Sequence, residues 1–339
     1  MASVRALVNL VRITVCSLIP LAIVFISAGV EAVALDCPAV HILPNLGAGK
    51  VLFEGFVTEG KTLPGTRRRD RIRSLFAEPA ADSLIVLRLA GIDHKIILDD
   101  HGAFAFTTPA WTGTATFAVI DPKLAQVLFQ KDLFLPSSPK FLMVSDIDDT
   151  IQVTEVTRRI RMLINSLLKK VENRLPVEGT SGPYRFVASG AHPHGTPLVV
   201  YLSCSPAAMA RSLEGFLEHN HFPAGVLVTK QLLKSDGSDP KVHKMKWLKR
   251  LAGLYPGLPF LFFGDGGEKD PEIYTEFAES GAVPVLGIII RQLPGSGSVD
   301  KPRFADLARR LQPKGVQILA WSSPDELRAG LVTLGFPIP

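Results

Sequence analysis

The sequence predicts an α/β protein in which a small β-rich domain precedes a larger parallel sheet covered by helices. Its 339 residues are enough for two domains of ordinary size. Short alternating runs separated by turn residues fill positions 37–139, whereas from residue 140 onwards continuous apolar runs alternate with helical stretches. We therefore expect a β-sandwich-like domain at 37–139 and an α/β domain at 140–339.

Residues 1–32 have the order of segments that is typical of a secretory signal peptide. Arg5 and Arg12 precede an apolar run at 13–30, and small residues follow it. We predict an exported protein, periplasmic or secreted, whose mature chain begins near Val33 or Leu35. A membrane-anchored form is the alternative, because an apolar run of about 18 residues can span a bilayer.

The composition is that of a globular protein, with 47% hydrophobic and 20% charged residues. A net charge of +5 is too small a surplus to indicate nucleic acid as a partner. Only three cysteines occur, and Cys16 lies in the predicted leader, so no disulfide framework is expected. No protein partner follows from the sequence.

The β-rich part contains strand signals but no catalytic constellation. Gly, Pro, Asp and Asn separate the expected strands, which cover residues 51–57, 83–89, 95–98, 103–106 and 115–120. The basic run at 67–71 is interpreted as a solvated loop, and contact with a phosphate or a membrane is its alternative.

In the second half, buried strands alternate with helices, which predicts a parallel sheet covered on both faces. The expected strands cover residues 141–145, 197–202, 226–229, 260–263, 283–290 and 316–320. The expected helices cover residues 156–171, 207–218, 241–254, 271–280 and 301–311. Ligands of such sheets bind beyond the carboxyl ends of the strands, where the polar motifs of this chain fall.

The first motif is an Asp-x-Asp-x-Thr pattern formed by Asp146, Asp148 and Thr150, directly after the strand at 141–145. An acidic turn that caps the next helix would be the simpler interpretation. However, a carboxylate at the end of a buried strand is costly unless it is paired or bound to a metal.

The second motif follows the strand at 197–202. A hydroxyl at this place can donate a hydrogen bond to a phosphoryl oxygen, and both Ser203 and Ser205 are available. Ser205 directly precedes Pro206, as an N-cap residue would. We therefore assign the phosphate contact to Ser203 and the cap to Ser205.

The third motif is a lysine near the start of the helix at 241–254. A cation beside a helix N-terminus suits a phosphate group. Lys241, Lys244 and Lys246 are candidates, and an ordinary surface lysine is the default for each of them.

The fourth motif is the glycine-rich stretch at 264–270, which contains Asp265 and Asp270. Two carboxylates on such a loop can turn towards one magnesium ion, which prefers oxygen ligands in octahedral geometry. A simple turn is the alternative, but the two preceding polar strand ends favour a metal site.

In this order, the four motifs resemble those of the haloacid dehalogenase superfamily. More narrowly, the chain resembles the phosphatidate phosphatase catalytic-domain family whose fungal member is associated with actin patches, with the lipins as more distant relatives. The resemblance rests on the stretches 145–151, 201–206, 243–244, 264–274 and 290–291. It departs from the family's usual pattern at Ala207, where tryptophan is usual, and at Gly266, where serine is usual. The role of Arg291 in this pattern is not evident from the sequence.

The resemblance implies a Rossmann-like parallel sheet of the haloacid dehalogenase type and a two-step phosphatase mechanism. Asp146 would be the nucleophile, and Asp148 would act as general acid and then as general base. Mg²⁺ would be held by Asp146, the backbone carbonyl of Asp148, Asp265 and, in or just beyond its first shell, Asp270.

Thr150, Ser203 and Lys244 would orient the phosphoryl oxygens and neutralise their charge. Lys244 is chosen over its neighbours because of its His-Lys context and its distance from the next strand. The resemblance implies phosphatidate as substrate, with diacylglycerol and phosphate as products, and peripheral contact with a membrane. The apolar stretch at 161–168, within the expected helix at 156–171, would then offer an approach for acyl chains, unless it simply packs on the sheet.

Three alternatives to this function are a phosphatase for a soluble phosphomonoester, a catalytically silent module that binds lipid or phosphate, and an anchored structural protein of the envelope. The presence of both Asp146 and Asp148 speaks against the silent module, because binding alone needs no general acid. The structural protein would leave the acidic motifs without a role.

Overall fold

The computed structural model describes residues 34–45, 49–60, 77–111, 113–134, 139–153, 175–230 and 239–338, with the backbone alone at Asn45, Phe134 and 297–300. The predicted leader at 1–32, the basic run at 67–71 and the predicted helix at 156–171 lie outside these residues. Residues Val33–Pro339 form one compact unit. Among the described helices, none combines the length and the apolar character that a membrane crossing requires.

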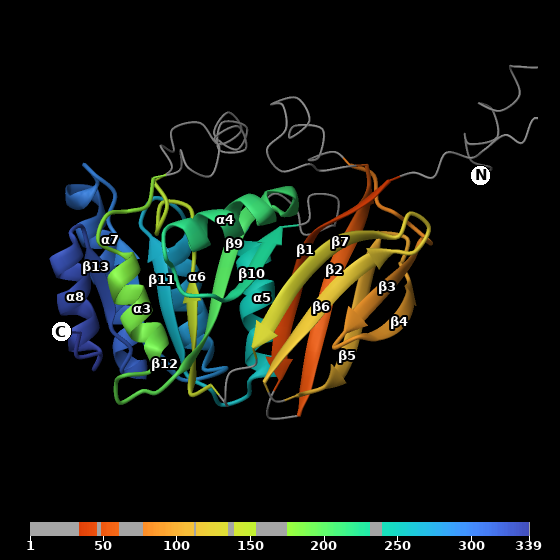
Figure 1. Ribbon diagram of the computed structural model, residues 1–339. Helices are drawn as coiled ribbons and strands as arrows, with labels where there is room; N and C mark the ends of the chain where they lie inside the picture. The colour runs from red at the N-terminus through yellow and green to blue at the C-terminus, as the bar shows by residue number, and fades with distance from the viewer. Residues whose placement is uncertain are drawn as a thin grey trace, which may run out of the picture. The chain divides into compact units, whose positions relative to one another are not determined.

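The first part of this unit consists of two antiparallel sheets (Figure 1). The three-stranded sheet has the order β1-β2-β5 and contains β1 (Leu35–Asn45), β2 (Lys50–Glu59) and β5 (Ala103–Pro109). The four-stranded sheet has the order β4-β3-β6-β7 and contains β4 (Ile92–Ile97), β3 (Leu84–Leu89), β6 (Thr114–Asp121) and β7 (Gln126–Phe134).

A single hydrophobic cluster joins the two antiparallel sheets. Buried and half-buried side chains alternate along β2, as expected for a strand with one face in a core. Phe53 of β2 stacks on Phe117 of β6 with ring centroids 4.5 Å apart. The five strands predicted from 51 to 120 are therefore confirmed, whereas β1 and β7 were not predicted.

The second part is a sheet of six parallel strands in the order β10-β9-β8-β11-β12-β13. The strands are β8 (Phe141–Ser145), β9 (Pro197–Pro206), β10 (Val226–Lys230), β11 (Phe260–Asp265), β12 (Val285–Arg291) and β13 (Ile318–Trp321). The sheet grows from β8 outwards in both directions, first through β9 and β10 and then through β11 to β13. The direction of growth reverses between β8 and β11, and open α/β sheets bind ligands at such a point.

Helices cover both faces of the parallel sheet (Figure 1). Phe141 and Met143 of β8 face one hydrophobic cluster, and Leu142 and Val144 face the other. The first cluster includes α3 (Ser181–Ser189), α4 (Ala210–His219) and α8 (Pro324–Thr333), and the second includes α5 (Pro240–Leu254), α6 (Asp270–Ser280) and α7 (Gly297–Leu311). The 3₁₀ turns are Ala207–Met209 and Gln312–Lys314. The predicted mixed α/β class with a parallel sheet is confirmed.

Polar contacts link the antiparallel sheets to helices of the parallel part. Arg211 of α4 donates hydrogen bonds to Asp36 Oδ1 at 2.8 Å and to the carbonyl of Leu128 at 2.7 Å. Arg250 of α5 forms an ion pair with Glu54 of β2. The division of the chain into domains at 37–139 and 140–339 stays a prediction, because the two parts pack within one unit.

Candidate active site

Asp146 lies at the point where the direction of sheet growth reverses. It directly follows β8, and its backbone N–H donates to the carbonyl of Phe263 in β11 at 2.9 Å. This bond extends the pairing of β8 and β11 by one residue. It therefore holds the backbone of Asp146 in place at the end of the strand. The residue is 4% exposed, so its carboxylate is buried at the edge of the sheet.

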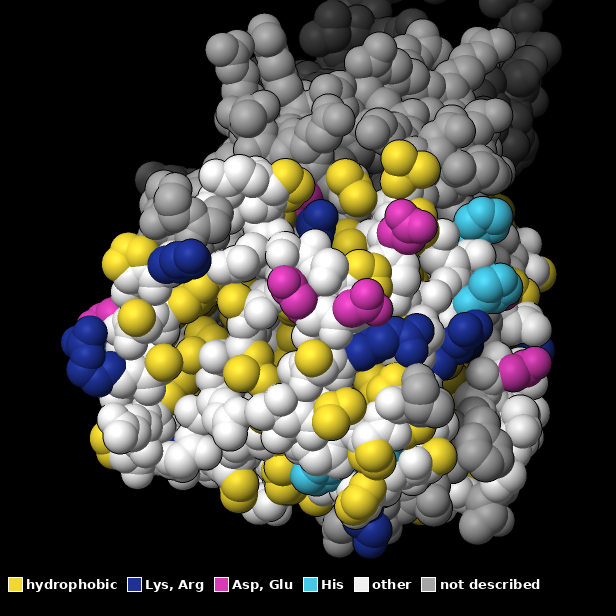
Figure 2. Space-filling model, turned by 90° about the vertical axis from the view of Figure 1, so that its left-hand side faces the viewer, with side chains coloured by type: hydrophobic (Ala, Val, Ile, Leu, Met, Phe, Trp, Pro, Cys, Tyr) yellow, Lys and Arg dark blue, Asp and Glu magenta, His cyan; other side chains and the backbone are white. Residues whose placement is uncertain are grey.

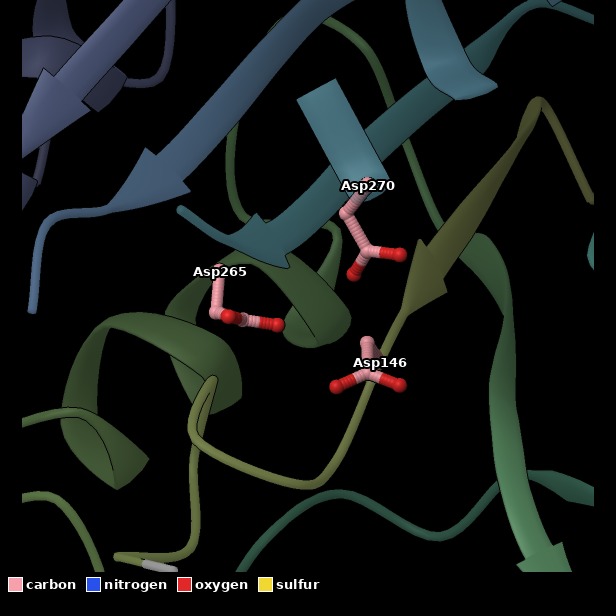
Figure 3. Close-up of side chains that lie close together, drawn as sticks. All are labelled: Asp146, Asp265 and Asp270. Atoms are coloured by element: carbon pink, nitrogen blue, oxygen red, sulfur yellow. The ribbon is translucent and has the colours of Figure 1, made fainter. Parts of the chain in front are cut away.

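Two further carboxylates converge on Asp146. Asp265 ends β11 and Asp270 begins α6, and oxygens of the three carboxyl groups lie within 4.8 Å of one another (Figure 3). Gly264 allows this approach, because a Cβ atom there would lie 2.7 Å from the Cβ of Asp270 and 2.8 Å from the ring of Tyr274. The strand end and the helix start therefore bring together acids five positions apart.

Lys244 of α5 is the cation of this cluster. Its Nζ donates to Asp146 Oδ1 at 2.9 Å and to Asp270 Oδ1. Burial by itself would lower the pKa of Lys244, but Asp146 and Asp270 together raise it well above its usual value, so the side chain is charged. Lys241 instead pairs with Glu276 at 2.6 Å. The Lys241 side chain is 43% exposed, whereas that of Lys244 is 1% exposed.

Three carboxylates accompany a single lysine, and two of their oxygens have no hydrogen-bond partner among the described residues. Asp265 Oδ1 accepts hydrogen bonds from the N–H groups of Gly267 at 2.7 Å and Glu268 at 3.0 Å. Asp265 Oδ2 and Asp270 Oδ2 are buried, and neither has a hydrogen-bond partner within the described part of the chain.

This excess of negative charge is reflected in the pKa values. Burial raises the pKa of Asp270 to about 7, Lys244 opposes the rise, and Asp146 adds to it. Burial, followed by Asp270 and then Asp146, raises the pKa of Asp265 well above its usual range. A buried site of acceptor-only oxygens with unsatisfied negative charge fits a hard divalent cation such as Mg²⁺.

Thr150 and Asp148 complete the loop after β8. The Thr150 hydroxyl donates to Asp146 Oδ2 at 3.2 Å, so Lys244 and Thr150 each hold one oxygen of Asp146. The Asp148 carboxyl group is not among the three that cluster. It is half-buried and accepts a hydrogen bond from Ser205 at 2.8 Å.

The prediction that Ser205 caps a helix was wrong. Pro206 occupies the N-cap of the 3₁₀ turn at Ala207–Met209 and makes no side-chain cap bond. The Ser205 hydroxyl is drawn to Asp148 instead, while Ser203 Oγ accepts the backbone N–H of Ser205 at 3.0 Å. Ser203 Oγ lies 3.5 Å from Asp148 Oδ2, so both serines line the Asp148 side of the site.

Tyr184 of α3 was not predicted as a site residue. Its hydroxyl lies 2.9 Å from Ser145 Oγ, directly before Asp146. No role was predicted for Arg291 either, and the structure places this residue against the loop after β8. Its Nη1 donates to the carbonyl of Asp149 at 2.6 Å. Both contacts join distant segments, and a local motif carries no signal for them.

Residues 141–292 match a family of phosphatases, which are phosphoric monoester hydrolases. The family is described as phosphatidate phosphatase APP1, catalytic domain. The matched segment contains all of the motifs and every candidate site residue, so the resemblance seen in the sequence is confirmed. The chain therefore carries a phosphatase catalytic domain.

The solved structures that resemble the chain do so weakly. They include a possible α-amylase from Salmonella typhimurium (10% identity, 72% of this chain and 48% of that chain covered, TM-score 0.25). A second is a carbohydrate acetylesterase from Xanthomonas citri (9% identity, 70% of this chain and 64% of that chain covered, TM-score 0.28). A third is a β-galacturonidase from Eisenbergiella tayi (8% identity, 85% of this chain and 64% of that chain covered, TM-score 0.28). The chain spans less than two thirds of the length of each. No curated protein matches the sequence.

Proposed function

We propose that this protein is a Mg²⁺-dependent phosphomonoester hydrolase of the haloacid dehalogenase type that converts phosphatidate to diacylglycerol and phosphate. The observation that carries this proposal is the buried cluster of Asp146, Asp265 and Asp270, two of which pair with Lys244, at the reversal point of a parallel sheet. The cluster lies inside the segment that matches a phosphatase catalytic domain.

Asp146 is the nucleophile in this proposal. One of its carboxylate oxygens forms a bond to phosphorus while the bond from phosphorus to the ester oxygen of the substrate breaks, which leaves an aspartyl-phosphate. Lys244 and Thr150 hold the carboxylate from both sides, at 2.9 and 3.2 Å, so the attacking oxygen has a fixed orientation.

Asp148 moves the protons. In the first step its carboxylic acid gives a proton to the departing ester oxygen, and in the second its carboxylate takes a proton from the water that attacks the aspartyl-phosphate. The second step releases phosphate and restores Asp146. The Ser205 hydroxyl, which donates to Asp148 Oδ2, holds this carboxyl group in place.

The metal would be held by Asp146 and Asp265, with the backbone carbonyl of Asp148 as a further ligand and Asp270 in or next to the coordination shell. Bound there, Mg²⁺ would supply positive charge against the phosphoryl oxygens. Asp265 and Asp270 each have a buried carboxyl oxygen without a hydrogen-bond partner in the part of the chain that the structure describes, which supports this assignment.

Lys244, Thr150 and Ser203 are the proposed contacts of the phosphoryl group. Lys244 is the charged member, and phosphoryl transfer depends mainly on positioning and charge neutralisation. Ser203 is 0% exposed and lies in the last part of β9, where its hydroxyl is 3.5 Å from Asp148 Oδ2.

A phospholipid substrate is supported by the family that the catalytic segment matches. A soluble phosphomonoester is the runner-up, because the chain departs from the family's usual pattern at Ala207 and Gly266. The predicted leader supports an exported enzyme, which would meet phospholipids at an envelope membrane.

The test is a comparison of kcat/KM for long-chain phosphatidate, short-chain phosphatidate and glycerol 3-phosphate, each with Mg²⁺ and with a chelator. We expect hydrolysis only with the metal and an efficiency that rises with acyl length. If kcat/KM does not depend on the acyl chains, the substrate is instead assigned as a soluble phosphomonoester. Binding of phosphatidate without turnover would favour the silent module.

A further inference from the structure

Arg303 of α7 contacts the loop that carries Asp265 and Asp270, although it lies more than thirty positions away in the chain. Its Nη1 donates to the carbonyl of Gly266 at 2.5 Å, and its Nη2 donates to the carbonyl of Glu268 at 2.8 Å. The same guanidinium makes a bidentate ion pair with Glu272 in the first turn of α6, with both bonds at 2.6 Å.

The bond to Gly266 bears directly on Asp265. The carbonyl of Gly266 and the N–H of Gly267 belong to one planar peptide group, so holding the oxygen also fixes where the N–H points. That N–H donates to Asp265 Oδ1 at 2.7 Å. With Oδ1 engaged in this way, Oδ2 of Asp265 is left facing the site without a hydrogen-bond partner in the described chain.

This peptide joins two residues without a Cβ atom, so the local sequence restricts its rotation little. A rotated peptide would withdraw the N–H from Asp265. On the other side, the N–H of Gly266 donates to the carbonyl of Arg291 at 2.8 Å, so β12 and α7 hold the loop from two directions.

We propose that Arg303 is a positioning residue for the metal loop, which orients Asp265 by holding the peptide carbonyls of Gly266 and Glu268. This inference rests on the proposed function, since it assumes that Asp265 binds Mg²⁺. Arg303 lies beyond residue 292, where the family match ends, so the metal loop depends on a helix outside the matched segment. A planar guanidinium suits this task because it can reach two carbonyls and a carboxylate at once.

The competing interpretation is that Arg303 merely ties α7 to α6 as a surface ion pair. Acidic and basic side chains are interspersed on the face that includes α7 and α8 (Figure 2), so such pairs are common here. Arg310 of α7 makes a bidentate pair of this kind with Glu279 of α6, and neither residue contacts the metal loop. Arg310 is therefore the matched control.

The experiment is a calorimetric titration of the full chain with Mg²⁺ alone, for wild type, Arg303→Ala, Arg303→Lys and Arg310→Ala. Residues that orient metal ligands typically contribute about 10- to 100-fold in affinity, so we expect a rise of that size in the Mg²⁺ dissociation constant of Arg303→Ala. Arg303→Lys keeps the positive charge but loses the planar guanidinium with its several donors. Its Mg²⁺ dissociation constant should therefore lie between those of wild type and Arg303→Ala. Arg310→Ala should bind Mg²⁺ as wild type does.

A kinetic measurement separates positioning from loss of structure. At saturating Mg²⁺, the kcat of Arg303→Ala should approach that of wild type, while the Mg²⁺ concentration for half-maximal rate rises with the dissociation constant. If Arg303→Ala does not fold, Arg303→Lys carries the test.

Equal Mg²⁺ affinity in wild type and a folded Arg303 variant would overturn the inference and leave the proposed function intact. An equal loss of Mg²⁺ affinity in Arg310→Ala would mean that Arg303 only holds α7 against α6, and it would overturn the inference as well. Absence of Mg²⁺ binding by wild type would instead overturn the metal assignment in the proposed function, and this inference with it.

Discussion

The Nη1 of Arg291 donates a hydrogen bond to the carbonyl oxygen of Asp149 at 2.6 Å and so connects the end of β12 to the loop that follows β8. Asp149 has a φ of 56°, a left-handed conformation that is unfavourable for a residue with a Cβ atom. Its N–H donates to the carbonyl of Gln152 at 2.8 Å, so both sides of the residue are held.

Because Asp149 lies between Asp148 and Thr150, we expect Arg291→Ala to misplace the proposed acid and base. A displacement of about 1 Å can lower a rate about 100-fold, so kcat should fall by about 10- to 100-fold. Steady-state kinetics at saturating Mg²⁺ checks this, with the exposed Arg309→Ala as control. A kcat equal to that of wild type would remove Arg291 from the support of this loop.

Asp146→Asn should abolish turnover while the fold remains. An amide is a poor nucleophile, and loss of a nucleophile typically costs about 10⁴-fold or more in kcat. Asp148→Asn should still form a phosphoenzyme slowly from a substrate with a good leaving group. Rapid-quench detection of the phosphoenzyme distinguishes the two variants, and Asp306→Asn, at an exposed ion pair of α7, serves as control. Turnover of Asp146→Asn at the wild-type rate would refute the mechanism.

Most strands of the parallel sheet could be predicted with nearly correct bounds. Strands buried on both faces have continuous apolar sequences, and β8 was predicted at its observed residues, 141–145. In contrast, β1 contains Pro38 and Pro44, and β7 mixes charged and apolar residues without clear alternation. Pairing with neighbouring strands determines these two elements, and the local sequence does not.

Two helices were also missed for local reasons. The sequence of α3 begins with Ser181, Gly182 and Pro183, which is typical of a turn, and yet its later residues Tyr184 and Val187 are fully buried. The short α8 places Leu327 and Leu331 in the core. Tertiary packing therefore stabilises both helices beyond their intrinsic propensity.

The candidate site was predictable wherever a motif marks the end of a strand, as for Asp146 and Asp265. The contact between Ser205 and Asp148 was not predictable, because an N-cap and a carboxylate partner require the same residue type. Arg303 carries no local signal at all, since its partners are decided by how α7 packs beside α6.

Asp265→Asn should stabilise the protein in the absence of metal and weaken Mg²⁺ binding. The variant removes one of three clustered buried carboxylates, only two of which pair with Lys244, and like charges in a buried site oppose folding. Thermal unfolding in a chelator should therefore show a higher Tm than for wild type.

With added Mg²⁺, wild type should instead have a higher Tm than Asp265→Asn. A ligand at 100 times its dissociation constant stabilises the folded state by about 2.7 kcal/mol, which wild type should gain and Asp265→Asn should largely lose. An unchanged Mg²⁺ titration of Asp265→Asn would exclude this residue from the metal site.

The predicted leader makes a separate prediction about the mature protein. If residues 1–32 are a signal peptide, N-terminal sequencing of protein from the envelope fraction should begin near Val33 or Leu35. An intact Met1 on membrane-bound protein would support the anchored form instead.

His41 of β1 should make the stability of the protein dependent on pH below neutrality. It is 7% exposed, its ring lies perpendicular to that of Trp247 with the ring centroids 5.0 Å apart, and its Nε2 has no hydrogen-bond partner in the described chain. Burial, then the charge of Arg250 and then His243, lower the pKa of His41 from 6.5 to about 4. The folded protein therefore holds this imidazole neutral at pH values where the unfolded chain protonates it.

The direction in which the free energy of unfolding changes with pH follows from proton uptake at His41. Above pH 6.5 both states are neutral at His41, and between pH 6.5 and about 4 only the unfolded state gains the proton, so the free energy of unfolding falls as the pH falls. The loss across this window is about 3 kcal/mol, and it levels off once the folded state is protonated too. Urea unfolding of wild type and His41→Phe at a series of pH values measures it. Relative to wild type, His41→Phe should become progressively more stable from pH 7 to pH 4, while the exposed His101→Gln should follow wild type throughout. A constant difference between His41→Phe and wild type over this range would show that His41 does not titrate differently in the folded and unfolded states.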